Sequence, residues 1–212
     1  MGWQVGGGPG RAGTASANEP HPVLARPQEF GDFFGIAVAG YPEAHPDAIV
    51  EDPAEMEANY RKDIAYLKEK CDAGADFVVT QLFYDVDQLL KFVEDCRASG
   101  ISAPIVPGVM PIMTYNGFKR MTGFCKTKVP KDIADGVEAR KDDDEGLKAY
   151  GIDVCAAACK RILDAGIPGL HMYTLNLEKS TMGALHKLGL VKDDQWAPAG
   201  AAAQGGSGCA TQ

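Results

Sequence analysis

Between residues 28 and 191, short apolar runs alternate with longer stretches in which apolar residues recur every three or four positions. The short runs predict parallel β-strands buried on both faces, at residues 34–40, 77–83, 104–110 and 169–175. A helical pattern follows each run, and most of these patterns begin with an acidic residue and end at a glycine, as at 52–74, 85–100 and 142–166. Repeated strand–helix units predict an α/β fold.

Polar residues collect where the predicted strands end. The turn GYPEAHP follows the first strand, Thr80 and Gln81 lie in the second, PGVMP closes the third and YTLN closes the fourth. Barrel enzymes place their active sites at the carboxyl ends of their strands. No G-x-G-x-x-G motif opens a helix, as a dinucleotide-binding doubly wound sheet would require. We therefore predict a fold of the (β/α)8 TIM-barrel family with about four strand–helix units, that is, a partial barrel.

Composition divides the chain into three segments. Residues 1–27 and 192–212 are rich in Gly, Ala, Ser and Pro and are expected to be disordered, whereas 28–191 forms one partial catalytic barrel. The head contains two arginines and few acidic residues, so an organelle transit sequence is an alternative to a plain linker.

Charge and cysteine usage exclude several classes of partner. A net charge of −8 disfavours nucleic acid and anionic membranes. The six cysteines lack the CxxC spacing of a zinc site, so we expect reduced thiols and no metal. No apolar stretch approaches about 18 residues, and we expect no membrane partner and a location in the cytoplasm.

A few polar residues are candidates for binding. Tyr41 and His45 stand beside prolines that restrict their backbone, which suits presentation to a ligand, although such residues also pack ordinary loops. Gln81 places an amide in a buried strand, where it needs a ligand or a local partner. Asp63 and Lys70 share a helix face seven residues apart, which is also common on a solvated surface.

Two further residues are assigned structural roles. Asn176 is expected to cap a helix over 177–189, and His171 is expected to lie in the core.

Five stretches in order, GYPEAHP, DAGADFVVTQLFYD, PIVPGVMPI, YGID and LHMYTLN, resemble the carboxyl half of the catalytic barrel of methylenetetrahydrofolate reductase, most closely its plant and algal members. The resemblance implies reduction of 5,10-methylenetetrahydrofolate to 5-methyltetrahydrofolate in one-carbon and methionine metabolism. It also implies FAD as cofactor, NADH or NADPH as reductant and a folate as substrate.

The resemblance also implies roles for individual residues. Those matching FAD contacts are Tyr41, His45, Ala48, Asp63 and Lys70, and those matching substrate contacts are Gln81 and Tyr173. Leu177 stands where many members of the family have an arginine. No catalytic residue is assigned, because the family's general-acid glutamate lies on a strand without a counterpart here.

Three hypotheses about function stay open. The first is a reductase that forms a homo-oligomer or pairs with a complementary half barrel, because four strands alone would leave two open edges. The second is a catalytically inactive, truncated fragment that acts only as a binding or interaction module. The third is a generic barrel isomerase or aldolase for phosphorylated substrates, which the lack of a Gly-rich loop after the third or fourth strand disfavours.

Overall fold

A computed structural model describes residues 33–192 of the 212-residue chain. The sequence predicts disorder for 1–27 and 192–212; the first segment and all but the first residue of the second lie outside the described residues, so those predictions are not tested. Within 33–192, no helix combines the length and the apolar character that crossing a lipid bilayer requires.

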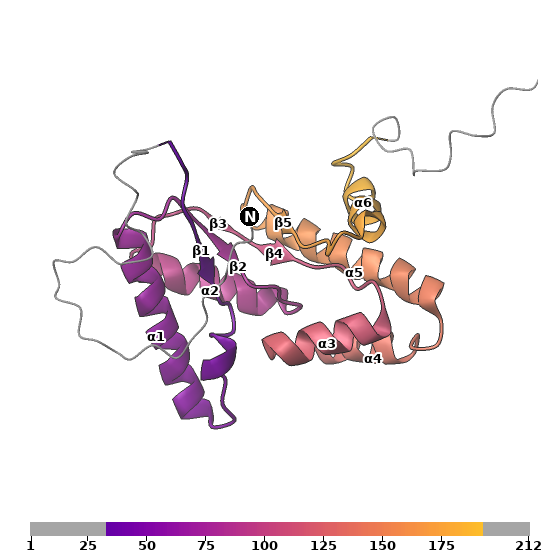
Figure 1. The fold of residues 1–212 in the computed structure, drawn as a ribbon, viewed down its shortest axis with the longest axis horizontal. Coiled ribbons are helices and arrows are strands. Elements are labelled where there is room, and N and C mark those ends of the chain that lie inside the picture. The colour runs from indigo at the N-terminus through magenta and orange to yellow at the C-terminus, as the bar shows by residue number, and fades with distance from the viewer. Residues whose placement is uncertain (1–32, 193–212) are drawn as a thin grey trace, which may run out of the picture.

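The strands form a parallel layer in chain order (Figure 1). The layer consists of β1 (Ala37–Gly40), β2 (Phe77–Thr80), β3 (Ile105–Val106), β4 (Gly108–Val109) and β5 (His171–Met172). Strand β2 pairs with β1 and β3, and β4 pairs with β5. The segment predicted as one strand over 104–110 is thus divided in two at Pro107. Proline has no N–H group to donate, and the carbonyl of Pro107 accepts a hydrogen bond of 2.8 Å from the His171 N–H.

Gly108 joins the two parts of the layer. Its N–H donates to the Thr80 hydroxyl at 2.9 Å, so the end of β2 lies directly against the start of β4. A Cβ atom at this position would lie 2.3 Å from the Thr80 carbonyl oxygen and 2.5 Å from the Tyr173 ring. Only glycine lets the backbone approach so closely. The four segments of the layer therefore stand in the order β1, β2, β3/β4 and β5.

The helices connect and cover these strands. They are α1 (Pro53–Asp72), α2 (Val86–Ala98), α3 (Tyr115–Cys125), α4 (Lys131–Glu138), α5 (Asp144–Asp164) and α6 (Glu178–Lys187), with a short 3-10 helix η1 (Pro46–Ala48). The side chains of Asp52, Asp85 and Asp143 cap the three long helices that the sequence predicts. Gly74, Gly100 and Gly166 follow the same helices with positive φ angles, as their position after a helix end requires.

Two structural assignments from the sequence are wrong. Asn176 does not cap α6, because Leu175 and Asn176 both adopt the left-handed conformation and the chain enters the helix through Leu177, which makes no side-chain cap. His171 is exposed rather than part of the core. It lies on the outermost strand of the described layer, with its ring edge-to-face against Tyr173.

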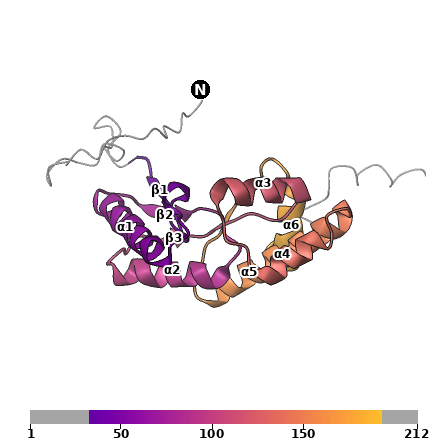
Figure 2. The ribbon, with the colours of Figure 1, turned by 90° about the horizontal axis from the view of Figure 1, so that it is seen from below.

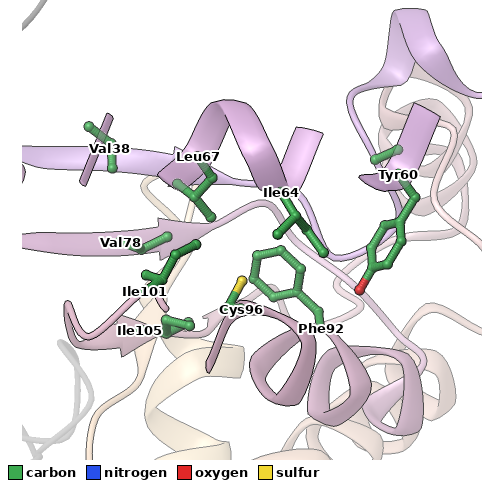
Figure 3. Packing of buried hydrophobic residues seen from close by; sticks show 10 residues of the cluster. Val38, Tyr60, Ile64, Leu67, Val78, Phe92, Cys96, Ile101 and Ile105 are labelled. Carbon is green, nitrogen blue, oxygen red and sulfur yellow. The ribbon is translucent and has the colours of Figure 1, made fainter. Parts of the chain in front are cut away.

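The helix-covered side of the strands holds the core. Figure 3 shows Ile64 and Leu67 of α1 and Phe92 of α2 gathered around Val78 of β2, and all four are nearly fully buried. A second cluster packs α5 and α6 against β4 and β5, and a third holds α3 and α4 against α5. In Figure 2, α1, α2 and α5 follow one another along one side of the molecule. This is the arrangement of consecutive strand–helix units of a barrel.

The opposite face of the strands is only partly covered by the described residues. Along β1, Val38 and Gly40 are buried, whereas Ala37 and Ala39 are exposed. In a closed parallel barrel both faces of each strand are buried. The described chain thus forms an open, partial barrel layer with one helix-packed face and one face available for further contacts.

Candidate functional site

The candidate site lies where the strands end. Tyr41 directly follows β1, Gln81 directly follows β2 and Tyr173 directly follows β5. Because parallel strands end at the same edge of a sheet, these three side chains come together. They line one cavity of about 240 Å³, which we call the strand-face cavity, with Ala37, Val38, Ala39 and Val79.

A second cavity of about 270 Å³ adjoins it and shares Ala39 and Tyr41 with it. We call this the turn cavity, because His45 of the GYPEAHP turn lines it together with Asp63, Tyr66 and Lys70 of α1. The two cavities adjoin at Tyr41, and we call them together the candidate groove. Tyr41, His45, Gln81 and Tyr173 therefore lie at one edge of the strand layer.

The turn that carries Tyr41 and His45 is anchored in place. The two rings lie edge-to-face, with centroids 4.9 Å apart and an interplanar angle of 71°. The His45 N–H donates to the Asp63 carboxylate at 2.5 Å, which fixes the turn to α1. Gln88 of α2 donates from its amide to the Pro42 carbonyl at 2.7 Å. The aromatic and imidazole groups are thus held in one orientation before any ligand arrives.

Helix α1 supplies the charged wall of the turn cavity. Asp63 and Lys70 share one helix face there. The Lys70 ammonium donates to the Ala39 carbonyl at 2.8 Å, and it lies 5.2 Å from the centroid of the Tyr66 ring. Burial lowers the pKa of Lys70, while Cys71 and Asp63 act in the opposite direction.

Sequence reasoning missed Tyr66, although a signal was present. It lies three residues after Asp63 and four before Lys70, which is the spacing of neighbours on one helix face.

Ala48 does not line either cavity. It ends η1, where its N–H donates to the His45 carbonyl at 2.8 Å and its carbonyl accepts from the Asn59 amide at 2.9 Å. Its closeness to the cofactor therefore stays a prediction, and its observed role is to hold the turn against α1.

Gln81 meets its hydrogen-bonding requirement only in part. Its side-chain oxygen accepts from the Leu82 N–H at 2.9 Å, whereas its NH2 group has no hydrogen-bond partner among residues 33–192. This amide is half-buried and lines the strand-face cavity, so its two N–H donors are available to a ligand there.

Tyr41 and Tyr173 keep their protons at neutral pH. Burial raises the pKa of Tyr41, and the Asp63 carboxylate raises it further. Burial also raises the pKa of Tyr173, whose hydroxyl donates to the Thr80 carbonyl at 3.0 Å. Within residues 33–192 no group of three His, Cys, Asp or Glu side chains is placed to hold a metal ion. The groove thus offers neutral aromatic rings, amide and hydroxyl groups, one carboxylate and one ammonium group.

Comparison with known proteins places this chain in a family. Residues 24–189 match the family model described as methylenetetrahydrofolate reductase. The chain belongs to the methylenetetrahydrofolate reductase family. Membership in this family confirms the predicted fold class, a partial (β/α)8 barrel, and the predicted assignment to a family of reductases.

Plant members of the family are similar to much of the chain. A probable methylenetetrahydrofolate reductase (NADH) of Oryza sativa subsp. japonica is 58% identical over 167 residues, which cover 79% of this chain and 28% of the relative. Methylenetetrahydrofolate reductase (NADH) 1 of Arabidopsis thaliana is 57% identical over 167 residues, which again cover 79% of this chain and 28% of the relative. The 5,10-methylenetetrahydrofolate reductase of Buchnera aphidicola is 33% identical and is covered over 51% of its length. The chain spans less than a third of the length of the two plant relatives.

Glu43 lies in the GYPEAHP turn, between Tyr41 and His45. Nothing in the sequence indicates that its carboxyl group is perturbed. One carboxylate oxygen accepts from the Lys128 N–H at 2.9 Å, and the other is buried without a hydrogen-bond partner among the described residues. Burial raises the pKa of Glu43 from 4.5 to about 7, and Asp85 raises it too, while Lys128 opposes the shift. The buried position therefore favours the protonated acid.

We expect this position to make the chain less stable above neutral pH. The folded-state pKa of Glu43 is raised, so its contribution to the free energy of unfolding is fully present below pH 4.5, its pKa in the unfolded chain. That contribution is lost as the pH rises through about 7, and the loss amounts to about 2 to 3 kcal/mol. In urea unfolding at pH 5 and pH 8, Glu43→Gln should lose less stability between the two pH values than the unchanged chain, by about that amount. The exposed Glu51→Gln is the control and should leave the difference unaltered. An equal loss in the unchanged chain and in Glu43→Gln would contradict the assignment.

Proposed function

We propose that this chain supplies the flavin- and folate-binding strand ends of an enzyme that reduces 5,10-methylenetetrahydrofolate to 5-methyltetrahydrofolate with NADH or NADPH. One observation carries the proposal. The turn cavity and the strand-face cavity meet at Tyr41, so the residues proposed for FAD adjoin those proposed for the folate. Family membership supports the reaction class.

The residues of the turn cavity fit a flavin dinucleotide. FAD carries flat ring systems and a negatively charged pyrophosphate, and it would relay hydride from the nicotinamide to the folate. Tyr41 and His45 offer rings held at fixed angles, and Asp63 offers a carboxylate acceptor for hydroxyl groups. Lys70 is the only lysine or arginine that lines the turn cavity, and two of its three N–H donors remain after its bond to the Ala39 carbonyl.

Gln81 and Tyr173 would orient the folate and the nicotinamide. The Gln81 NH2 group can donate to a ring carbonyl, and its neighbour Tyr173 closes the same cavity with an un-ionised hydroxyl. The pterin and nicotinamide rings would exclude water from the strand face. Asp63 is the one carboxyl group that lines the two cavities, so any other carboxylic acid that protonates the folate must come from outside them.

We also propose that turnover requires a complementary half barrel, supplied by another chain or a second copy. The exposed Ala37 and Ala39 lie on the strand face that a closed barrel would bury. The cytoplasm is the proposed compartment.

Purified full-length chain tests the proposal. We expect it to become yellow when mixed with FAD and freed of excess cofactor, and to oxidise NADH in the presence of a quinone such as menadione. A colourless chain that takes up no FAD would contradict the proposal and would favour the inactive-fragment hypothesis. A chain that retains FAD but does not oxidise NADH would support the cofactor site and would show that oxidation of NADH needs a half barrel supplied by another chain.

A further inference from the structure

A third and larger cavity lies among the helices. It measures about 580 Å³, and residues at the start of α2, the end of β4, the start of α4 and positions 150–161 of α5 line it. We call it the helix-side cavity. It shares no lining residue with the turn cavity or the strand-face cavity. It is of a size that takes a small organic molecule.

A buried hydroxyl without a partner belongs to this cavity. Tyr84 lines the cavity and is only 7% exposed. Its hydroxyl makes no hydrogen bond to any of residues 33–192. The Tyr84 ring is held edge-to-face against Phe118, with centroids 5.1 Å apart. Burial raises the pKa of Tyr84, and the nearby thiol of Cys155, which also lines the cavity, raises this pKa further. The hydroxyl is therefore a protonated donor without an acceptor, in a residue that lines the cavity, and a ligand oxygen brought against it would satisfy it.

The remaining walls define the chemistry of the ligand. Apolar side chains form most of the surface, among them Val86, Val109, Ile112, Ile133 and Val154. An aromatic or alicyclic body would bury apolar area against them.

The charged residues of the cavity are mostly acidic. Four aspartates line it, at positions 85, 87, 132 and 153, against the single cation Arg161. Arg161 is paired with Asp87 at 2.5 Å, while Asp85 pairs with Lys128 and Asp153 with Lys187. Asp132 has no ion pair within the described residues. This excess of carboxylates disfavours phosphates and other anions and favours a cation.

We propose that the helix-side cavity binds a small organic cation with an apolar aromatic body, which accepts a hydrogen bond from the Tyr84 hydroxyl and places its ammonium group near Asp132. The site is separate from the flavin and folate groove, and the proposal does not depend on the reductase activity.

A pair of matched probes tests the site with the full chain. 4-(2-Aminoethyl)acetophenone carries a carbonyl acceptor and an ammonium group on one ring, and 3-(4-acetylphenyl)propanoate replaces the ammonium with a carboxylate. In titrations followed by ¹H–¹⁵N correlation spectra, we expect the amine to bind at millimolar concentration and to shift amide signals of Asp85, Asp132 and Gly151. The carboxylate should bind at least about tenfold more weakly.

Two variants separate recognition from folding. Tyr84→Phe removes only the hydroxyl and should weaken binding of the amine about tenfold, with an unchanged or higher melting temperature because an unsatisfied group is removed. Tyr115→Phe, whose hydroxyl bonds to Glu138 away from the cavity, should leave the affinity unchanged. Three results would each overturn the proposal: no binding of the amine at millimolar concentration, equal binding of the carboxylate, or full affinity in Tyr84→Phe.

Discussion

Replacing Gly108 with alanine is expected to destabilise the chain by about 3 kcal/mol and to displace Tyr173 from the strand-face cavity. The added Cβ would lie 2.3 Å from the Thr80 carbonyl oxygen, a backbone atom that cannot rotate away, and 2.5 Å from the Tyr173 ring. The layer would have to open between β2 and β4, which would lengthen the bond from the Gly108 N–H to the Thr80 hydroxyl. The midpoint of urea unfolding measures the loss.

Gly123→Ala is the matched control. It makes the same chemical change inside α3, where no atom lies within 4 Å of the new Cβ. We expect it to leave stability unchanged or to raise it by up to about 1 kcal/mol, because alanine favours the helix. If Gly108→Ala were as stable as Gly123→Ala, the close contact between the two parts of the strand layer would be wrong.

Replacing Asp63 with alanine is expected to weaken FAD binding about 10- to 100-fold. The Asp63 carboxylate accepts the His45 N–H at 2.5 Å, and it lines the turn cavity itself. Its loss frees the turn that carries Tyr41 and His45 and removes a proposed acceptor for the cofactor. A hydrogen bond to a charged group contributes about 1.5 to 3 kcal/mol, which corresponds to this range of affinity. Quenching of FAD fluorescence in a titration measures the change.

Two further variants identify the cause of that loss. Asp63→Asn keeps an oxygen acceptor for the His45 N–H, so we expect it to retain more affinity than Asp63→Ala. Asp72→Ala removes a carboxylate from the same helix that pairs with Lys68 on the surface, and it should bind FAD as the unchanged chain does. Equal affinity in Asp63→Ala and Asp72→Ala would show that the turn does not depend on Asp63.

Much of the fold is predictable from the sequence because its signals are local. Asp52 and Gly74 stand just outside the two ends of α1, as a capping residue and a glycine with positive φ should. Parallel strands also follow from continuous apolar runs. The division at Pro107 is visible in the sequence as well, since a proline inside a strand removes a ladder donor.

Other features depend on packing between distant segments and leave no local pattern. The Glu43 carboxylate accepts a hydrogen bond from the backbone of Lys128, which lies 85 residues further along the chain. Asn176 is of a residue type that often caps helices, yet it follows Leu175 in the left-handed conformation and lies one position before Leu177, where α6 is entered. For the site, helix spacing correctly predicts that Asp63 and Lys70 share one face, and the same spacing would have added Tyr66.

Hydrogen–deuterium exchange of the full chain with and without FAD tests the central claim most directly, because it reports which backbone segments the cofactor orders. If the groove around Tyr41 binds FAD, protection should increase in peptides covering 39–48 and 63–70 and should stay unchanged along residues 150–161 of α5. No protection in the first two segments, or protection confined to α5, would contradict the account.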